Sequence, residues 1–454
     1  MKNCVIYKNA IVLTVNSGGI MAKAALHYLG CKVNAYETDA MSQLLEEAGY
    51  EIVAFNEKAD VYIINTCSVT NMADRKSRQM LHRAKKLNPE AIVVATGCYV
   101  QTAKDKVIED LSVDIVVGNN KKKDIVSIIE EYRKNNIISK EENIIDINKT
   151  DEYEELELET ITEHTRAHLK IQDGCNNFCS YCIIPYARGR SRSRKFENIK
   201  AEIERLASQG FKEIVLTGID LGDYRYKDYR LADVIEMADK IPGIERIRTG
   251  SIDPEVVTED FVKRISKCKH VCGHFHLSLQ SGCSKTLKEM NRNYNADEFY
   301  KKAELIRKYF DNPALTTDVI VGFAGESDED YIESREFVKK VEFAELHVFK
   351  YSIRTGTVAA KRKDQVDEKI KTQRSDDLIK VGKELTRKYR EQWIGKDVDV
   401  LFEEKVMVDN KEYWVGHTPE YIKVIAESAQ NLEGAIITVT LIKSINDEIM
   451  LATI

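Results

Sequence analysis

Residues 173–194, DGCNNFCSYCIIPYARGRSRSR, hold three cysteines in the spacing C-x3-C-x2-C, and they follow a short apolar segment, residues 167–172, that has the pattern of a strand. Five more strand candidates come after them, with helical patterns between: residues 213–218, 246–252, 274–280, 315–323 and 346–352. Strands that alternate with helices in this way predict a full or partial (β/α) barrel. Cys175, Cys179 and Cys182 would then lie in the loop after its first strand, at the end where barrel active sites form.

Three thiolates at this spacing can hold three irons of a [4Fe–4S] cluster and leave the fourth iron open for a further ligand. The alternative is a structural zinc site, which needs a fourth protein ligand. No Cys or His follows the triplet at short spacing, although His164 and His168 lie upstream. The spacing therefore favours an open, catalytic cluster over zinc.

A second series of strand and helix patterns precedes the barrel. The apolar runs that read as strands are residues 24–30, 50–55, 59–67, 91–99 and 113–119. Amphipathic helical patterns between them predict a doubly wound parallel sheet. Cys31, Cys67 and Cys98 each follow one of these strands, and the carboxyl ends of neighbouring parallel strands lie side by side. A single such cysteine is more often a buried small residue, but three at the same topological position predict a second cluster.

The 454 residues imply two or three domains. We find no run of about eighteen apolar residues and no secretory signal, so we expect a cytoplasmic protein without a transmembrane helix. The pattern along the chain predicts five parts, with Met21 as the working start: a poorly ordered extension (1–20), an α/β domain (21–145), a solvated acidic linker (146–163), the barrel domain (164–385) and a small β-barrel of OB-like size (386–454).

The triplet and its flanks resemble the radical S-adenosylmethionine (SAM) superfamily, whose signature has this spacing. The resemblance implies that the open iron binds SAM, and that an electron from the cluster splits SAM into methionine and a 5′-deoxyadenosyl radical. Tyr181 matches the aromatic residue that lies near the adenine of SAM. Gly218 and Asp220, after the second barrel strand, match the Gly-rich segment that contacts its amino group.

Polar residues at the ends of later barrel strands are further candidates for SAM contacts, because such groups usually face the ligand. Ser251, Gln280 and Asp318 are in this position, although capping of the strand end competes as the role of Ser251. Arg192 is a candidate for a bidentate contact with the SAM carboxylate.

The whole chain from Met21 resembles the radical SAM methylthiotransferases, which have an N-terminal domain with three cysteines, a radical SAM barrel and a C-terminal TRAM domain. The segments NTCSVT, TGCY, RGRSRSR, HLSLQSG, MNRNY and GTVAA carry the resemblance. LGCKVNAYET, together with Cys283 after QSG, looks like the subgroup that acts on N6-threonylcarbamoyladenosine, the tRNA purine just 3′ of the anticodon.

This resemblance implies two [4Fe–4S] clusters and SAM as cofactors, and insertion of a methylthio group at adenine C2. The implied partners are the tRNA anticodon stem-loop, a sulfur donor and a one-electron reductant such as flavodoxin or ferredoxin, and no membrane. Three alternatives stay open: another tRNA adenosine as substrate, a ribosomal-protein aspartate as substrate, or a non-catalytic iron–sulfur protein that binds RNA.

Contacts with tRNA phosphates come mainly from Lys and Arg, and small β-barrels bind nucleic acid through aromatic and basic side chains. The candidates are Arg188, Arg190 and Arg194 near the triplet, and Trp414, Tyr421 and Lys423 in the C-terminal barrel. The segment 361–390 adds eleven Lys or Arg against six Asp or Glu. A basic helix is usually a solvated face, however, and Trp414 would equally suit a core.

Cys268 and Cys272 lie close in sequence to three histidines, which invites a metal site. Alternate side chains of a strand point to opposite faces, and both clusters already have their ligands. We therefore interpret these groups as buried thiols and structural histidines.

Overall fold

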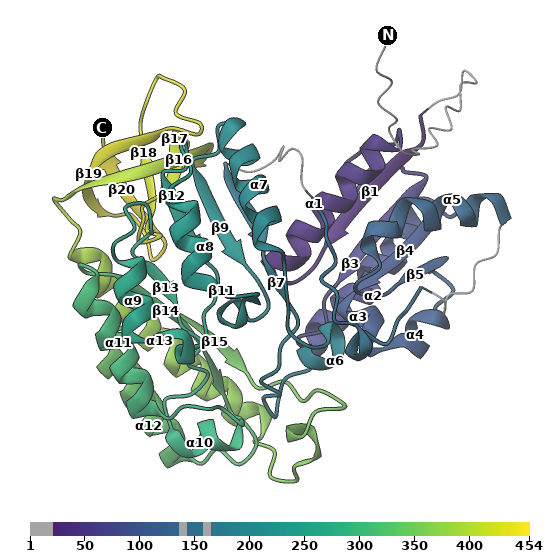
Figure 1. The fold of residues 1–454 in the computed structure, drawn as a ribbon. Helices are drawn as coiled ribbons and strands as arrows, with labels where there is room; N and C mark the ends of the chain where they lie inside the picture. Colours follow the sequence, from purple (N-terminus) through teal and green to yellow (C-terminus); the bar gives the residue numbers. More distant parts are fainter. Residues whose placement is uncertain (1–20, 136–142, 158–164) are drawn as a thin grey trace.

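A computed structural model describes residues 21–135, 143–157 and 165–454. The chain forms an N-terminal α/β domain, a central barrel and a small C-terminal β-barrel (Figure 1). No helix in the described part of the chain is long and apolar enough to cross a membrane. The predicted extension at 1–20 lies outside the described residues.

The N-terminal domain is the predicted parallel sheet, with the strand order β2-β1-β3-β4-β5. Its strands are β1 (Lys23–Tyr28), β2 (Glu51–Ile52), β3 (Val61–Thr66), β4 (Ile92–Gly97) and β5 (Ile115–Val117). Its helices are α1 (Lys32–Glu47), α2 (Asn71–Leu87), α3 (Cys98–Thr102), α4 (Lys104–Ile108) and α5 (Ile125–Asn135), with the 3-10 turn η1 (Lys122–Asp124). Apolar clusters pack on both faces of the sheet, so its central strand β3 is buried throughout.

The central domain has the six strands that the sequence predicts, as a partial barrel. Two parallel sheets, β12-β9-β6 and β13-β14-β15, are joined by bridges from Ile247 to Val271 and from Ile252 to Leu277. The strands are β6 (Arg166–Lys170), β9 (Glu213–Thr217), β12 (Arg246–Thr249), β13 (His274–His276), β14 (Ala314–Val321) and β15 (Glu345–Lys350). Strands β6 and β15 therefore form the two edges of the open barrel.

Helices cover the outside of this barrel, and side-chain caps start several of them. Ser327 and Asn295 each form a capping box at the start of a helix. The helices are α6 (Ile184–Arg188), α7 (Phe196–Ser208), α8 (Leu231–Ala238), α9 (Glu259–Ile265), α10 (Ser284–Glu289), α11 (Ala296–Tyr309), α12 (Asp328–Val341) and α13 (Glu368–Glu391). The remaining short elements are η2 (Ile147–Lys149), β7 (Gln172–Asp173), β8 (Arg192–Ser193), η3 (Leu221–Asp223), β10 (Arg225–Tyr226), β11 (Tyr229–Arg230), η4 (Pro254–Val256) and η5 (Ala359–Lys361).

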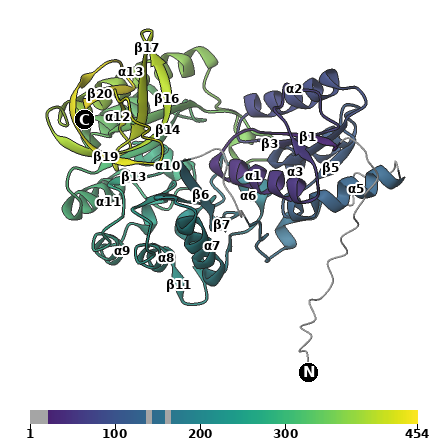
Figure 2. The ribbon, with the colours of Figure 1, turned by 90° about the horizontal axis from the view of Figure 1, so that it is seen from above.

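The C-terminal domain is the predicted small β-barrel, closed in the order β16-β17-β18-β20-β19. Its strands are β16 (Asp397–Val408), β17 (Lys411–His417), β18 (Lys423–Ala426), β19 (Ile436–Ser444) and β20 (Ile449–Thr453). Helix α13 runs to Glu391, a few residues past the predicted domain boundary at 385. Figure 2 shows this barrel against the central domain, with the N-terminal domain on the other side.

Two arginines on β12 of the central barrel bind the C-terminal barrel. Arg246 donates hydrogen bonds to the carbonyl oxygens of His417 (2.8 Å) and Asp399 (2.8 Å). Arg248 donates to those of Pro419 (2.8 Å) and Thr418 (3.2 Å). The contact is therefore made largely to main-chain atoms.

The acidic segment before the central barrel is not the solvated linker that its composition predicts. Glu154 and Leu156 are buried, and Glu155 pairs with Arg194. The Tyr153 hydroxyl donates to the Lys170 carbonyl oxygen at 2.8 Å. The prediction is wrong for residues 153–156, whose side chains pack against buried groups of the barrel, whereas Asp151, Glu152 and Glu157 are exposed as expected; residues 158–163 lie outside the described residues.

A group of buried charges joins the N-terminal domain to the central barrel. Glu37 on α1 pairs with Arg188 (2.8 Å), Lys170 (2.6 Å) and Lys122 (2.8 Å). Asp173 also pairs with Arg188 (3.0 Å) and Lys170 (2.6 Å). Although burial disfavours a charged carboxylate, the three surrounding cations hold the pKa of Glu37 well below its usual range. All these side chains are shielded from solvent, so the group exists only when the two domains are docked.

Replacing Glu37 by Gln should lower the free energy of unfolding by about 3–5 kcal/mol, because three buried cations lose their counter-charge. The matched control is Glu51→Gln, since Glu51 is half-exposed and 3.7 Å from Lys23, and this change should cost less than about 1 kcal/mol. Urea unfolding of both variants measures the difference.

The pKa of Glu37 is lower in the folded protein than in the unfolded chain. Its contribution to the free energy of unfolding is therefore complete above the unfolded pKa and is lost as pH falls towards the folded value. The difference in stability between wild type and Glu37→Gln should narrow in acid. Equal losses in the two variants would contradict this account.

Candidate active site

The three N-terminal cysteines lie where the sequence predicts, after the neighbouring strands β1, β3 and β4. Cys31 precedes α1, Cys67 follows β3 and Cys98 begins α3. Burial, together with the nearby Cys98 and Cys31, raises the pKa of Cys67 to about 11. Gly30 has a φ of +100°, and a Cβ atom there would lie 2.7 Å from the Cys67 sulfur. Only glycine suits this position.

The second cysteine trio lies in the loop that follows β6 and β7. The Cys175 amide donates to the Gly189 carbonyl oxygen at 3.1 Å, and the Cys182 amide donates to that of Cys179 at 2.9 Å. Burial and the neighbouring Cys179 raise the pKa of Cys182 to about 12. Ligand binding must therefore displace the thiol protons.

Neither cysteine trio is as compact as three sulfur ligands of a single zinc ion. Two sulfur ligands of one zinc ion lie at most about 4.6 Å apart, twice the Zn–S bond length. Among the described residues, only His276, Asp318 and His347 bring three possible ligand atoms within 4.8 Å of one another, and neither cysteine trio does. Three cysteine thiolates suit a four-iron cluster with one open iron instead.

Arg292 is a site residue that we did not single out from the sequence, although it lies in the MNRNY segment. Its Nη1 donates to the Cys179 sulfur at 3.1 Å, and its Nη2 pairs with Asp253 at 2.6 Å. A cationic donor on a ligating sulfur favours the thiolate and tunes the potential of a bound cluster.

Asp220 lies beside the triplet, and Gly218 lies against Gln172. The Cys175 thiol lies 3.6 Å from the Asp220 carboxylate, which also accepts a hydrogen bond from the Asn177 side chain at 3.1 Å. Burial, with Asp253 and Asp223 nearby, raises the pKa of Asp220 to about 6. The Gln172 side chain accepts the amide protons of Ile219 and Asp220, which sets the turn after Gly218.

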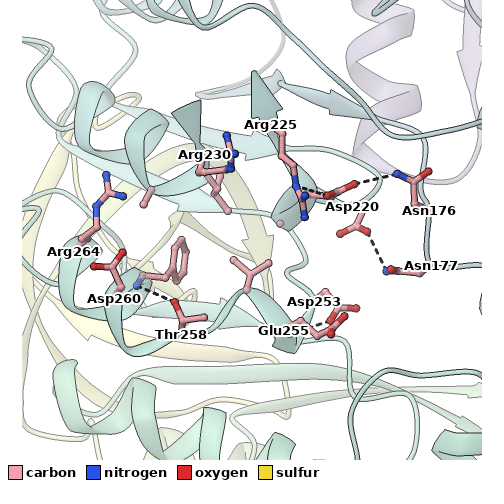
Figure 3. A pocket seen from close by; sticks show the side chains of 16 residues that line it. Asn176, Asn177, Asp220, Arg225, Arg230, Asp253, Glu255, Thr258, Asp260 and Arg264 are labelled. Carbon is pink, nitrogen blue, oxygen red and sulfur yellow. Dashed lines mark hydrogen bonds and ion pairs between the residues drawn. The ribbon is translucent and has the colours of Figure 1, made fainter. Parts of the chain in front are cut away.

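Asp220 and Asn177 form one end of a cavity of about 590 Å³. Figure 3 shows these two side chains turned towards each other, with Asp260 and Arg264 at the far end. Tyr181 lies elsewhere, packed edge-on against Phe323 at 6.4 Å. Contacts of these residues with SAM stay predictions.

Two of the strand-end candidates line a different cavity, of about 270 Å³. Ser251 follows β12 as predicted, but Asp318 lies within β14 rather than at its end, because β14 continues to Val321. Gln280 lies beyond β13 with a φ of +67°, and its amide donates to the Asp318 carbonyl oxygen. A non-glycine residue in this left-handed conformation is uncommon and often marks a functional loop.

Two of the arginines after the triplet do not face RNA. Arg188 is fully buried and paired with Glu37 and Asp173, and Arg194 is buried and paired with Glu155 and Glu202. The prediction that they bind RNA is wrong, because buried acidic groups of other segments neutralise them.

Arg190 and Arg192 differ from these two. Arg190 is exposed, with its guanidinium 4.4 Å from the Phe178 ring. Arg192 is buried and donates to the Arg188 carbonyl oxygen at 2.9 Å. Its Nε and Nη1 have no hydrogen-bond partner among the described residues, so this guanidinium keeps the capacity to bind an anion.

The aromatic candidates in the C-terminal barrel are occupied within the protein. Trp414 is buried in the barrel core, so the prediction that it stacks on RNA is wrong. Tyr421 stacks between His274 and His417 and lies under Arg248, so it serves domain docking instead. Lys423, half-buried on β18, stays a predicted RNA contact.

The segment 361–390 and the cysteines before β13 also have internal roles. On α13, Lys371 donates to the Tyr351 carbonyl oxygen and Arg374 pairs with Glu326. Cys272 is buried and Cys268 half-buried, and neither belongs to the compact ligand group. That group contains His276, a histidine that the sequence led us to interpret as structural.

Two family models match the chain. Residues 23–118 match the "Uncharacterized protein family UPF0004", and residues 169–338 match the radical SAM superfamily. The solved structure of TsrM, a radical SAM methyltransferase from Kitasatospora setae with cobalamin and a [4Fe–4S] cluster bound, has a TM-score of 0.57 over 75% of this chain and 77% of that chain. Its sequence identity is 14%, so this likeness concerns the fold alone.

Relatives with printed activities span most of the chain. Threonylcarbamoyladenosine tRNA methylthiotransferase MtaB of Bacillus subtilis is 41% identical, covering 93% of this chain and 94% of the relative. The same-named protein of Aquifex aeolicus is 39% identical over 86% of this chain and 94% of its own length. The tRNA-2-methylthio-N(6)-dimethylallyladenosine synthase of Clostridium botulinum strain Loch Maree is 38% identical over 82% of this chain and 84% of its own.

The cofactors that follow from these matches are SAM and [4Fe–4S] clusters, which the two sulfur trios suit. With both family models in place and relatives of this identity along most of its length, the chain belongs to the radical SAM methylthiotransferases, in the threonylcarbamoyladenosine tRNA methylthiotransferase subgroup.

Proposed function

We propose that this chain inserts a methylthio group at C2 of N6-threonylcarbamoyladenosine, the tRNA purine just 3′ of the anticodon. The observation that carries the proposal is the position of Arg188 between the two cysteine trios. Its charge acts on Cys31, Cys67 and Cys98, and its guanidinium binds Asp173, two residues before Cys175. One base that entered between the domains would meet both sites. The curated relatives with this activity support the choice of substrate.

In this proposal each trio holds one cluster: Cys31, Cys67 and Cys98 in the N-terminal domain, and Cys175, Cys179 and Cys182 in the barrel. When bound, the clusters and SAM supply a carbon radical, which activates the unreactive C–H bond of C2, and a sulfur that is methylated before transfer. The protein's own residues position these groups. Arg292 donates to Cys179, and Asp220 and Asn177 contact each other beside Cys175.

The docked domains also keep water from the space between the two cysteine trios. Glu37, Lys170 and Arg188 are each at most 1% exposed, so the space between the trios is sealed on that side. Exclusion of water protects a reactive radical from side reactions.

Recognition of the tRNA anticodon stem-loop would use the exposed Arg190 and, from the C-terminal barrel, Lys423. The chemistry further requires a sulfur donor and a one-electron reductant such as flavodoxin or ferredoxin. Mass spectrometry of tRNA nucleosides from cells with and without this protein tests the function directly. Loss of the methylthio derivative of dimethylallyladenosine instead would overturn the substrate, and unchanged tRNA would overturn the function.

Replacing Cys67 by Ala should reduce the iron of the anaerobically reconstituted protein from about eight to about four atoms per chain, because one cluster is lost. Cys182→Ala should do the same at the other site. The control is Cys272→Ala, a buried thiol outside both trios, which should keep the full iron content. Iron and sulfide analysis measures these values. Full iron in Cys67→Ala would contradict the ligand assignment.

The same two variants should separate the two proposed uses of SAM: methylation of the sulfur at the N-terminal cluster, and formation of the radical at the barrel cluster. Cys67→Ala should form no methylthiolated tRNA yet still release 5′-deoxyadenosine, since the radical arises at the other site. Cys182→Ala should lose both products. Chromatography of the small molecules and of digested tRNA gives the two readouts; loss of SAM cleavage in Cys67→Ala would refute this division of labour.

Binding of the tRNA should weaken steeply with salt, because phosphate contacts release counterions. Arg190→Ala should make the slope of log K against log salt shallower by about 0.7–0.9, the value for one lost contact. Filter binding at several salt concentrations measures the slope. A flat salt response of the wild-type protein would argue against a tRNA partner.

A further inference from the structure

The cavity of about 270 Å³ lies inside the central barrel, and residues from all three domains line it. The N-terminal domain supplies Lys32, and the C-terminal barrel supplies Tyr421. The central barrel supplies the rest: Thr249, Gly250, Ser251, His274, His276, Thr316, Asp318, Glu345 and His347. A ligand here would be enclosed only when the whole chain is assembled.

The register of β13, β14 and β15 gathers polar side chains on the inward face. Thr316 pairs with His276 on one side and with Glu345 on the other, and Asp318 pairs with His347. Paired residues of adjacent strands point to the same face, and so do residues two apart. Barrel interiors are ordinarily filled by branched apolar residues, so this polar face is unusual.

The two histidines of β13 are incompletely hydrogen-bonded. The Nδ1 atom of His274 is buried without a hydrogen bond among the described residues, and the Nε2 atom of His276 has only the Asp318 carboxylate, at 3.4 Å. Buried polar atoms are nearly always bonded, so unpaired ones on a cavity wall indicate a missing ligand or water.

Lys32 brings a positive charge to this cavity directly after Cys31. Its side chain is solvent-accessible and, within the described part of the chain, forms no ion pair or hydrogen bond. A cation with neither an ion pair nor a hydrogen bond among the described residues suits an anionic ligand.

We propose that this cavity receives the threonylcarbamoyl substituent of the substrate base and that Lys32 binds its carboxylate. The inference rests on the proposed function and extends it to the recognition of the modified base. The substituent has a carboxylate, a hydroxyl and urea N–H groups in about ten non-hydrogen atoms, and the cavity is just below the usual volume for a whole small molecule.

The other polar groups fit the same ligand. Asp318 and Glu345 accept hydrogen bonds from its N–H and O–H groups, and the imidazoles of His274 and His276 bind its oxygen atoms. A dimethylallyl group would leave these side chains unpaired, and a site built to hydrogen-bond its substrate rejects such an analogue. Because Lys32 adjoins Cys31, the same contact would hold the base beside the N-terminal cluster.

The test compares Lys32→Met, which keeps the length of the side chain and removes its charge, with wild type in the reconstituted enzyme. On tRNA that carries threonylcarbamoyladenosine, kcat/KM should fall about 10- to 100-fold, mostly through KM. Lys32→Arg should recover most of the loss. Lys23→Met is the matched control, since Lys23 is a half-exposed lysine at the start of β1, 3.7 Å from Glu51, and it should equal wild type. Iron content should be the same in all four proteins.

A second substrate isolates the carboxylate. Methyl esterification of the threonyl carboxylate should slow wild type about as much as Lys32→Met does, and the variant should lose little more on the ester. If esterification slows Lys32→Met by the same factor as it slows wild type, the proposed contact between Lys32 and the carboxylate is wrong.

Two further results would also overturn the inference. One is full activity of Lys32→Met on the natural substrate. The other is about one zinc ion per chain, beyond the iron, that disappears in His347→Ala, since His276, Asp318 and His347 would then hold a metal ion. If wild type does not convert this tRNA at all, the proposed function itself fails; if it does and Lys32→Met is unaffected, only the inference fails.

Discussion

The relation between the two cysteine trios depends on the buried charges of Glu37, Arg188 and Asp173. Glu37 comes six residues after Cys31, Asp173 two residues before Cys175, and Arg188 six residues after Cys182. Each buried charge is costly without its partners, so α1, β7 and α6 are held in one arrangement. A second contact acts in the same direction: Arg354, beyond β15, binds Ser68 and Asp74 just after Cys67. The relative position of the two trios thus follows from how the domains dock.

The local pattern of the sequence was enough to place the cysteines. Short apolar runs predicted β1, β3, β4 and β6, and the topology of parallel strands placed the residues that follow them at one edge. The small C-terminal barrel was likewise predictable from its short strands and turns. Asp318 shows the limit of such patterns, because nothing local marked where β14 ends.

Contacts between distant segments were beyond the reach of the sequence. Arg188 and Glu37 are 151 residues apart, so a run of arginines looked like an RNA-binding surface although two of its members are buried. The acidic stretch at 153–156 looked solvated for the same reason. The polar barrel face was hidden too: its histidines, Asp318 and Glu345 come from three strands, and only their register shows that they share a side.

The way in which Arg246 and Arg248 dock the C-terminal barrel has a consequence for how this family can diversify. Their acceptors at residues 399 and 417–419 are backbone carbonyls, which every amino acid provides. Side chains at residues 399 and 417–419 can therefore change over evolutionary time without the loss of these four hydrogen bonds. Because these hydrogen bonds do not depend on side-chain identity, the surface of the C-terminal barrel can acquire new nucleic-acid preferences while the central domain keeps its sequence.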